Sequence, residues 1–294
     1  MRKRSLLARL RTNGFYYLVS SLLLLVAIPL YQVLVLNPTG FSDTRTMGHL
    51  NDYLFWLGNH TPLFVIYRGL LAIAFAILFT MPYTLYRIIV AQEILGRSPD
   101  EESIAEAEIE LEENEELEEL AEEEAEANEI EPEEEATEEN TMPEFAWRGK
   151  GFAIIAVWTG TAGIALFVLG TVLGTIYLLN ASHGFMQTGE TPANIGTFDA
   201  IFTITTNTIS IGLIAISSMF FGAMIARAGK RLWPGNWLWF SYMALAVAAL
   251  LSGSAVGVAS APSTGQATLT TFAILLFGIW NLWHSIMLLR LKAE

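Results

Sequence analysis

The chain has 294 residues, of which 53% are hydrophobic, and its mean hydropathy of +0.43 is high for a soluble domain. It contains no cysteine, which excludes disulfides, thiolate metal sites and cysteine nucleophiles. The formal net charge of -14 comes from one segment, because 25 of the 30 acidic residues lie between Glu93 and Glu144, while the rest of the chain carries 15 basic residues against 5 acidic ones.

The N-terminal segment, residues 1–14, holds five basic residues and no acidic one. The apolar run from Phe15 to Leu36 that follows is long enough to cross a bilayer. It is too long for the apolar part of a signal peptide, and no small-residue cleavage site follows it. We therefore predict an uncleaved first span with a kink at Pro29.

The second span is expected at residues 63–89, after an outer loop at residues 37–62. In that loop Tyr53, Phe55 and Trp56 predict a short interfacial helix, because aromatic rings favour the headgroup level of a membrane. Residues 15–89, with this loop, make up a two-span membrane part.

Residues 90–146 form an acidic loop, whose densest part runs from Asp100 to Glu144. Its alanine, glutamate and leucine residues are good helix formers, but like charges four residues apart repel each other. We expect a disordered segment or a fluctuating single helix.

A four-span part at residues 147–294 follows. Its spans are predicted at 151–178, 198–226, 237–260 and 267–289, with an outer loop at residues 180–196. No convincing internal repeat is present, so an inverted-repeat transporter fold is not supported.

Six spans place both termini on the same side. Fourteen of the 16 basic residues fall on that side, the exceptions being Arg45 and Arg68. The positive-inside rule makes that side cytoplasmic. The predicted fold is an all-α, multi-pass protein of the cytoplasmic membrane, with six transmembrane helices arranged 2+4 around an acidic cytoplasmic loop.

The fourth span carries a polar face. Asp199, Thr203, Thr206, Ser210 and Ser217 follow one another at steps of 4, 3, 4 and 7, which is one face of an α-helix, and Asn207 lies beside them. Such a face points inward in a membrane. It predicts either the wall of a polar path or hydrogen bonds between helices.

Three further polar residues are expected inside the membrane boundary. Arg68 lies near the outer end of the second span, where it either pairs with Asp199 or extends to the outer headgroups. Asn281 and His284 share a face of the sixth span. A proton or haem role for His284 needs a second histidine or a carboxylate at similar depth, and the sequence offers none, so a packing histidine is the better interpretation.

Glycine pairs at GxxxG spacing occur at Gly170 and Gly174 in the third span and at Gly253 and Gly257 in the fifth. Without a side chain, helix backbones approach closely, and packing drives helix association in lipid. The pairs predict packing within the four-span part or, alternatively, a homo-oligomer seam.

These observations predict a non-catalytic membrane-complex subunit or scaffold whose acidic loop engages a basic protein partner. The alternative is a small permease or channel-like transporter with a polar path along the fourth span. Against transport, the spans lack the buried acids that proton- and sodium-coupled transporters usually use. The sequence predicts no cofactor, no metal site and no nucleic-acid partner. It predicts that the lipid bilayer surrounds the protein.

Overall fold

A computed structural model describes residues 2–41, 50–95, 144–260 and 266–290. All regular structure in these ranges is helical. The acidic segment from Asp100 to Glu144 lies outside the described residues, except for Glu144 itself, and so do Arg45 and the rest of residues 42–49.

Six helices in the described residues are long and apolar enough to cross a membrane, which confirms the predicted number. They run over Arg9–Thr39, Thr61–Val90, Gly151–Thr188, Ile195–Lys230, Gly235–Gly257 and Phe272–Leu289. By the composition of its helices the chain is therefore a multi-pass membrane protein.

The first span is interrupted by wide turns. It consists of α1 (Arg2–Leu22), the π-helical turn η1 (Leu23–Ala27), α2 (Ile28–Tyr31), the π-helical turn η2 (Gln32–Leu36) and the 3-10 turn η3 (Asn37–Thr39). The two π turns flank Pro29, the predicted kink position. Proline has no N–H to donate and its ring collides with the carbonyl four residues earlier, so wider turns relieve the local conflict.

The second span begins after α4 (Leu50–Asn59), the short helix predicted around Trp56. It is made of α5 (Thr61–Ile77), the 3-10 turn η4 (Leu78–Thr80) and α6 (Met81–Leu95). Pro82 is the second residue of α6, directly after η4, so the change of helical geometry falls in the turn that the proline ring crowds.

The four later spans are α8 (Glu144–Thr188), a composite fourth helix, α11 (Gly235–Ser260) and α12 (Gln266–Leu289). The fourth helix joins α9 (Ile195–Thr203), the seven-residue π turn η5 (Ile204–Ser210) and α10 (Ile211–Leu232).

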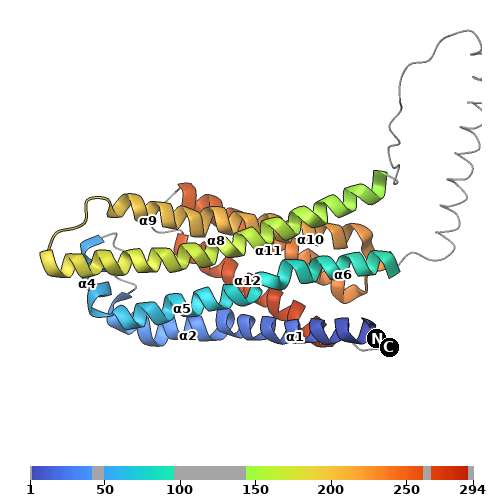
Figure 1. The fold of residues 1–294 in the computed structure, drawn as a ribbon, viewed down its shortest axis with the longest axis horizontal. Coiled ribbons are helices and arrows are strands. Elements are labelled where there is room, and N and C mark those ends of the chain that lie inside the picture. Colours follow the sequence, from blue (N-terminus) through green and yellow to red (C-terminus); the bar gives the residue numbers. More distant parts are fainter. Residues whose placement is uncertain (1, 42–49, 96–143, 261–265, 291–294) are drawn as a thin grey trace, which may run out of the picture. The chain divides into compact units, whose positions relative to one another are not determined.

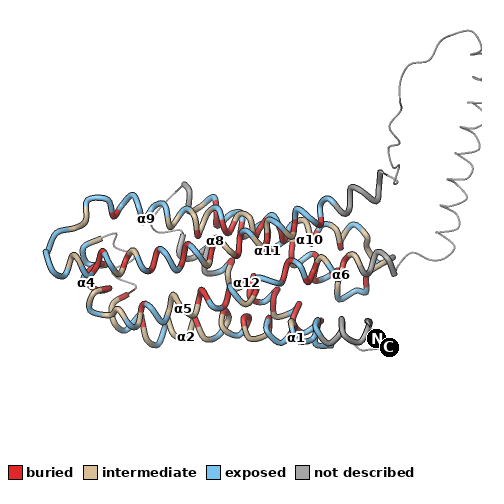
Figure 2. The backbone as a smooth tube through the Cα atoms, viewed as in Figure 1, coloured by how far each residue is buried: buried red, intermediate tan, exposed pale blue. Residues whose placement is uncertain are grey.

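The two predicted membrane parts pack together as one compact unit, residues 1–87 with 151–294. The α1 and α12 helices, which are far apart in sequence, lie side by side in this unit (Figure 1). Buried residues line the facing sides of the helices, and exposed residues occupy their outer sides (Figure 2). Exposed apolar residues such as Trp158 and Trp239 make the outer sides suitable for contact with lipid.

The predicted outer loop at residues 180–196 is wrong in its first half, because α8 continues to Thr188. No proline interrupts α8 before Gly189, which has a φ of 68°. The extension is also held by α4, since the Ser182 hydroxyl donates to the Leu54 carbonyl at 2.7 Å. This contact gives the last turns of α8 a partner that the linear sequence does not show.

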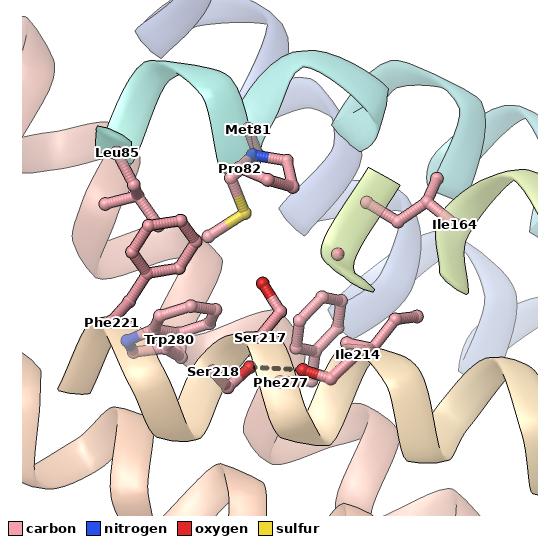
Figure 3. Close-up of a pocket in the computed structure, with 11 residues that line it drawn as sticks. Met81, Pro82, Leu85, Ile164, Ile214, Ser217, Ser218, Phe221, Phe277 and Trp280 are labelled. Carbon is pink, nitrogen blue, oxygen red and sulfur yellow. Dashed lines mark hydrogen bonds between the residues drawn. The ribbon is translucent and has the colours of Figure 1, made fainter. Parts of the chain in front are cut away.

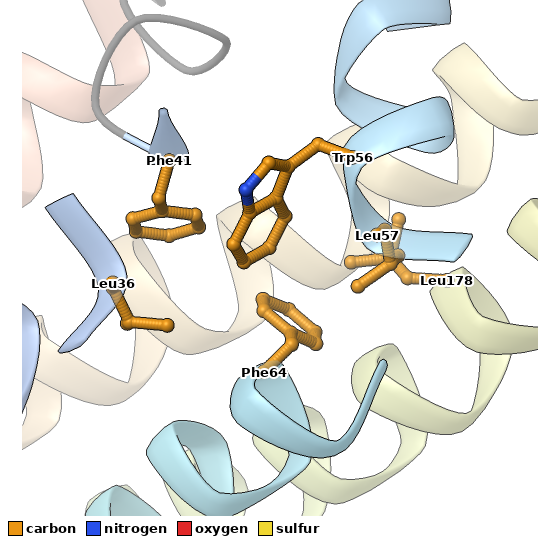
Figure 4. Close-up of a cluster of buried hydrophobic side chains, with 6 residues drawn as sticks. All are labelled: Leu36, Phe41, Trp56, Leu57, Phe64 and Leu178. Atoms are coloured by element: carbon orange, nitrogen blue, oxygen red, sulfur yellow. The ribbon is translucent and has the colours of Figure 1, made fainter. Parts of the chain in front are cut away.

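An aromatic cluster closes this end of the bundle (Figure 4). Its buried residues are Leu36, Phe41, Trp56, Leu57, Phe64 and Leu178. The Trp56 Nε1–H donates to the Thr39 carbonyl at 2.9 Å, which fixes the ring. Trp56 is thus an inward-facing core residue, whereas its neighbour Phe55 is exposed.

Candidate functional site

Four buried polar residues lie on one face of α12. Trp280, Asn281, His284 and Ser285 are spaced so that a helix brings them to the same side, and all four are buried. We name these four residues the α12 polar cluster. Its neighbours come from α1 and α11, which pack against α12.

Two contacts position the α12 polar cluster. The Ser285 hydroxyl donates to the Gly14 carbonyl of α1 at 2.9 Å. A Cβ on Gly14 would lie only 2.9 Å from the Leu288 Cβ, so the close approach of α1 and α12 requires glycine there. The His284 ring packs against Tyr17, with 5.6 Å between ring centroids, and against Phe240 at 5.5 Å.

Five polar atoms of the cluster have no hydrogen-bond partner within the part of the chain that the structure describes. They are Trp280 Nε1, both side-chain polar atoms of Asn281 and both ring nitrogens of His284. Each of these atoms is shielded from solvent. An unpaired buried polar group destabilises a protein by about 1–3 kcal/mol. Residues kept at such a cost are candidates for a functional role.

A satisfied polar network lies beside the unpaired cluster and joins α1 to the second span. The Tyr17 hydroxyl is 3.0 Å from the Thr80 Oγ1 and 2.8 Å from the Thr84 Oγ1. The Asn13 amide donates to the same Thr84 oxygen at 3.2 Å. Sequence analysis missed this network, although Asn13 and Tyr17 are spaced four residues apart, as are Thr80 and Thr84.

Aromatic rings continue from His284 through the core of the unit. Phe240 stacks on Trp280 at 5.1 Å, and Trp280 lies 5.9 Å from Phe277. Phe277 stacks on Phe75 of α5 at 5.9 Å, and Phe75 stacks on Phe167 of α8 at 3.9 Å. These contacts tie the first two spans to the last four, so the predicted two parts share one core.

The fourth-span hydroxyls are engaged in helix contacts. Ser210 donates to the Gly163 carbonyl of α8 at 2.8 Å, and Ser217 donates to the Ala156 carbonyl at 2.7 Å. Thr206 donates to the Phe202 carbonyl in its own helix at 2.7 Å. Asp199, Thr203 and Asn207 are partly exposed. The structure therefore brings Thr206, Ser210 and Ser217 to buried positions and leaves the other three nearer the surface.

The two glycine pairs have different surroundings. A Cβ on Gly170 would lie 2.6 Å from Thr206 Cγ2, and one on Gly174 would lie 3.3 Å from Phe202 Cβ. Both glycines therefore allow the fourth helix to pack closely against α8. At Gly253 and Gly257 no described heavy atom lies within 4 Å of the corresponding Cβ position.

Arg68 contacts the third span. Its Nε donates to the Thr175 hydroxyl at 3.2 Å, and its guanidinium lies 5.8 Å from the centre of the Phe64 ring. The outer part of the fourth helix reaches a similar level of α8, because Phe198 lies 5.0 Å from Tyr177 between ring centroids. Pairing of Arg68 with Asp199 stays a prediction.

A small pocket lies where α6, α8, α10 and α12 meet (Figure 3). Met81, Pro82, Ile164, Phe221, Phe277 and Trp280 are among its lining residues. The space open to the centre of a water molecule is about 20 Å³, room for one water. The hydroxyls of Ser217 and Ser218, which border the pocket, are already bonded to helix carbonyls. The pocket is therefore apolar in character.

In the described ranges no three His, Asp or Glu side chains come together as metal ligands. Comparison of the chain with protein-family models, curated protein sequences and solved structures gave no match in any of the three.

One prediction follows from the fourth-span contacts. Ser217→Ala removes the hydrogen bond to the Ala156 carbonyl, and we expect it to lower the stability of the detergent-solubilised protein by about 1 kcal/mol. The matched control is Ser252→Ala, because Ser252 is exposed on α11. Reversible unfolding monitored by tryptophan fluorescence measures both, and equal stabilities for the two variants would contradict the role given to Ser217.

Proposed function

We propose that the chain is a non-catalytic, multi-pass subunit or scaffold of a membrane complex. In this proposal both termini and residues 90–146 are cytoplasmic, and the acidic segment recruits a basic protein partner. The observation that carries the proposal is the use of fourth-span hydroxyls as links to α8, through Ser210 and Ser217. Groups engaged in holding helices together are not free to line a path.

The charge distribution supports the same proposal. Residues 100–144 hold 24 of the 30 acidic residues and no basic one. Clustered charge of one sign steers association with oppositely charged partners and weakens with added salt. Binding through this segment is expected to fall as ionic strength rises.

Partner recruitment is tested by affinity purification from native membranes. The full chain is compared with a deletion of residues 100–140 and with a variant of equal length in which the glutamates of that segment are replaced by glutamine. Proteins captured by the full chain and lost in both variants, with loss also at high salt, would support the scaffold. Identical protein profiles for all three chains would contradict it.

A second candidate function is a small permease or channel-like transporter. It is favoured by the π turn η5 within the fourth helix, because π-helical turns inside α-helices occur frequently at functional sites. Asn207 and Ser210 lie in this turn. Asn207→Leu with Ser210→Ala should abolish uptake into liposomes if the fourth span lines a path, and it should leave partner capture unchanged if the chain is a scaffold.

A further inference from the structure

The residues of the fourth helix that face α8 do not follow one continuous α-helical spacing. The spacing changes by one residue at η5, and we call the two alternatives the π register and the α register. On the α10 side, Ser217 contacts Ala156 and Ser210 contacts Gly163. On the α9 side, Phe198 packs on Tyr177, and Phe202 Cβ lies 3.3 Å from the Cβ position of Gly174. The residues that face α8 before η5 are therefore Phe198 and Phe202.

A continuous α-helix would present other residues. At about 100° per residue, Asp199 and Thr203 fall on the same face as Ser210 and Ser217, while Phe198 lies about 100° away. A π-helical turn closes i→i+5 hydrogen bonds and so holds one more residue than the α-helical turn. The extra residue in η5 turns the preceding helix by one position, which puts Phe198 where Asp199 would otherwise lie.

Two features distinguish η5 and α9 from the α10 side. The Thr208 hydroxyl in η5 is buried and has no hydrogen-bond partner among the described residues. Exposed residues occupy most positions of α9, including Thr197, Ala200 and Ile201, whereas the α10 side is fixed to α8 by two hydrogen bonds. Rotation of α9 therefore leaves these two hydrogen bonds in place, although it moves Ile195, which packs with Leu54 and Ala181.

We propose that η5 is a register switch in the fourth helix. When η5 converts from a π turn to α-helix, α9 moves by one residue relative to α10, and Asp199 and Thr203 take the places of Phe198 and Phe202 against α8. The switch changes the surface that α9 presents to α8 from aromatic to polar. The spacing of the polar residues fits the α register, whereas the structure is in the π register.

Cysteine pairs test the switch, because the chain has no cysteine of its own. The full-length chain with Gly174→Cys and Phe202→Cys reports the π register, since a Cβ–Cβ separation of 3.3 Å needs only a few tenths of an ångström to reach the range of about 3.5–4.5 Å found in disulfides. The chain with Gly174→Cys and Thr203→Cys reports the α register. The chain with Gly174→Cys and Ile201→Cys is the control for undirected motion, because neither register brings Ile201 to Gly174.

Oxidation of the three variants in membranes should give disulfides with Phe202→Cys and with Thr203→Cys, each several-fold above the Ile201→Cys control. Disulfide formation with Thr203→Cys no greater than with Ile201→Cys would overturn the proposal. Equal yields from all three pairs would also overturn it, since they would indicate a loosely packed α9 with no discrete registers.

Deleting Thr208 provides a second test. Removing one residue from η5 leaves a continuous α-helix in which Phe202 remains opposite Gly174. In this background the Phe202→Cys pair should still form its disulfide, and the Thr203→Cys pair should fall to the level of the Ile201→Cys control. Retention of the Thr203→Cys disulfide would overturn the proposal. Formation of the Phe202→Cys disulfide also reports that the deletion variant is folded in this region.

Discussion

Replacing Gly163 by valine is expected to destabilise the bundle by about 2–4 kcal/mol, the sum of overpacking and one lost hydrogen bond. A Cβ at this position would lie 2.9 Å from the Ser210 carbonyl oxygen and 3.0 Å from the Ile214 backbone nitrogen. Backbone atoms cannot move aside as side chains do, so α8 and α10 must separate. That separation also breaks the Ser210 hydrogen bond to the Gly163 carbonyl.

Thermal unfolding in detergent measures the change, with Gly253→Val as the matched control. A Cβ at Gly253 meets no described atom within 4 Å, so this substitution should change the stability of the monomer by less than about 0.5 kcal/mol. Equal loss of stability in both variants would contradict the packing assigned to Gly163. A change of oligomeric state confined to Gly253→Val would support the homo-oligomer seam predicted for the fifth span.

Replacing Asn281 by leucine is expected to raise the stability of the bundle by about 1–3 kcal/mol. Leucine has a similar volume, and it removes two buried polar atoms that have no partner. His284→Phe should act in the same direction, because phenylalanine keeps the ring contacts with Tyr17 and Phe240 and removes two unpaired nitrogens. Chemical unfolding in a fixed detergent measures both variants.

The control is Ser285→Ala in the same helix, which should lower stability because Ser285 donates to Gly14. Destabilisation by Asn281→Leu would contradict the prediction and would mean that the amide binds a molecule or adopts another conformation in the native protein. Stabilisation accompanied by loss of partner capture would instead identify the α12 polar cluster as a functional site maintained at the expense of stability.

Composition and hydropathy were sufficient to predict the six long helices, because each span carries its own apolar run. They were insufficient for the end of α8, which depends on the contact of Ser182 with Leu54, a residue more than 100 positions away. The short helix α4 was predicted from its aromatic residues. The burial of Trp56 was not, since it depends on Phe41 and Phe64 folding over the ring.

The residues of the candidate site could be predicted from the sequence, but their lack of hydrogen-bond partners could not. Asn281 and His284 stand out in an apolar helix, yet whether they find partners is decided by the helices that pack against them. The one-residue change of register at η5 was likewise hidden, because the spacing from Asp199 to Ser217 fits an unbroken α-helix. Only the contacts of Phe198 and Phe202 with α8 reveal the extra residue.

The third span, within α8, is longer than the hydrocarbon layer of a bilayer is thick, so part of the bundle extends beyond that layer. The 38 residues from Gly151 to Thr188 extend about 57 Å at 1.5 Å per residue, nearly twice the hydrocarbon thickness of about 30 Å. A bilayer centred on the bundle leaves the aromatic cluster around Trp56 at the margin of the lipid or in water. Where water reaches this cluster, it drives apolar burial and gives unfolding a positive heat capacity, whereas lipid-embedded helices associate without that force. The aromatic end should therefore respond to urea and to cooling as a small soluble core does, while the membrane-embedded middle responds mainly to the surrounding lipid.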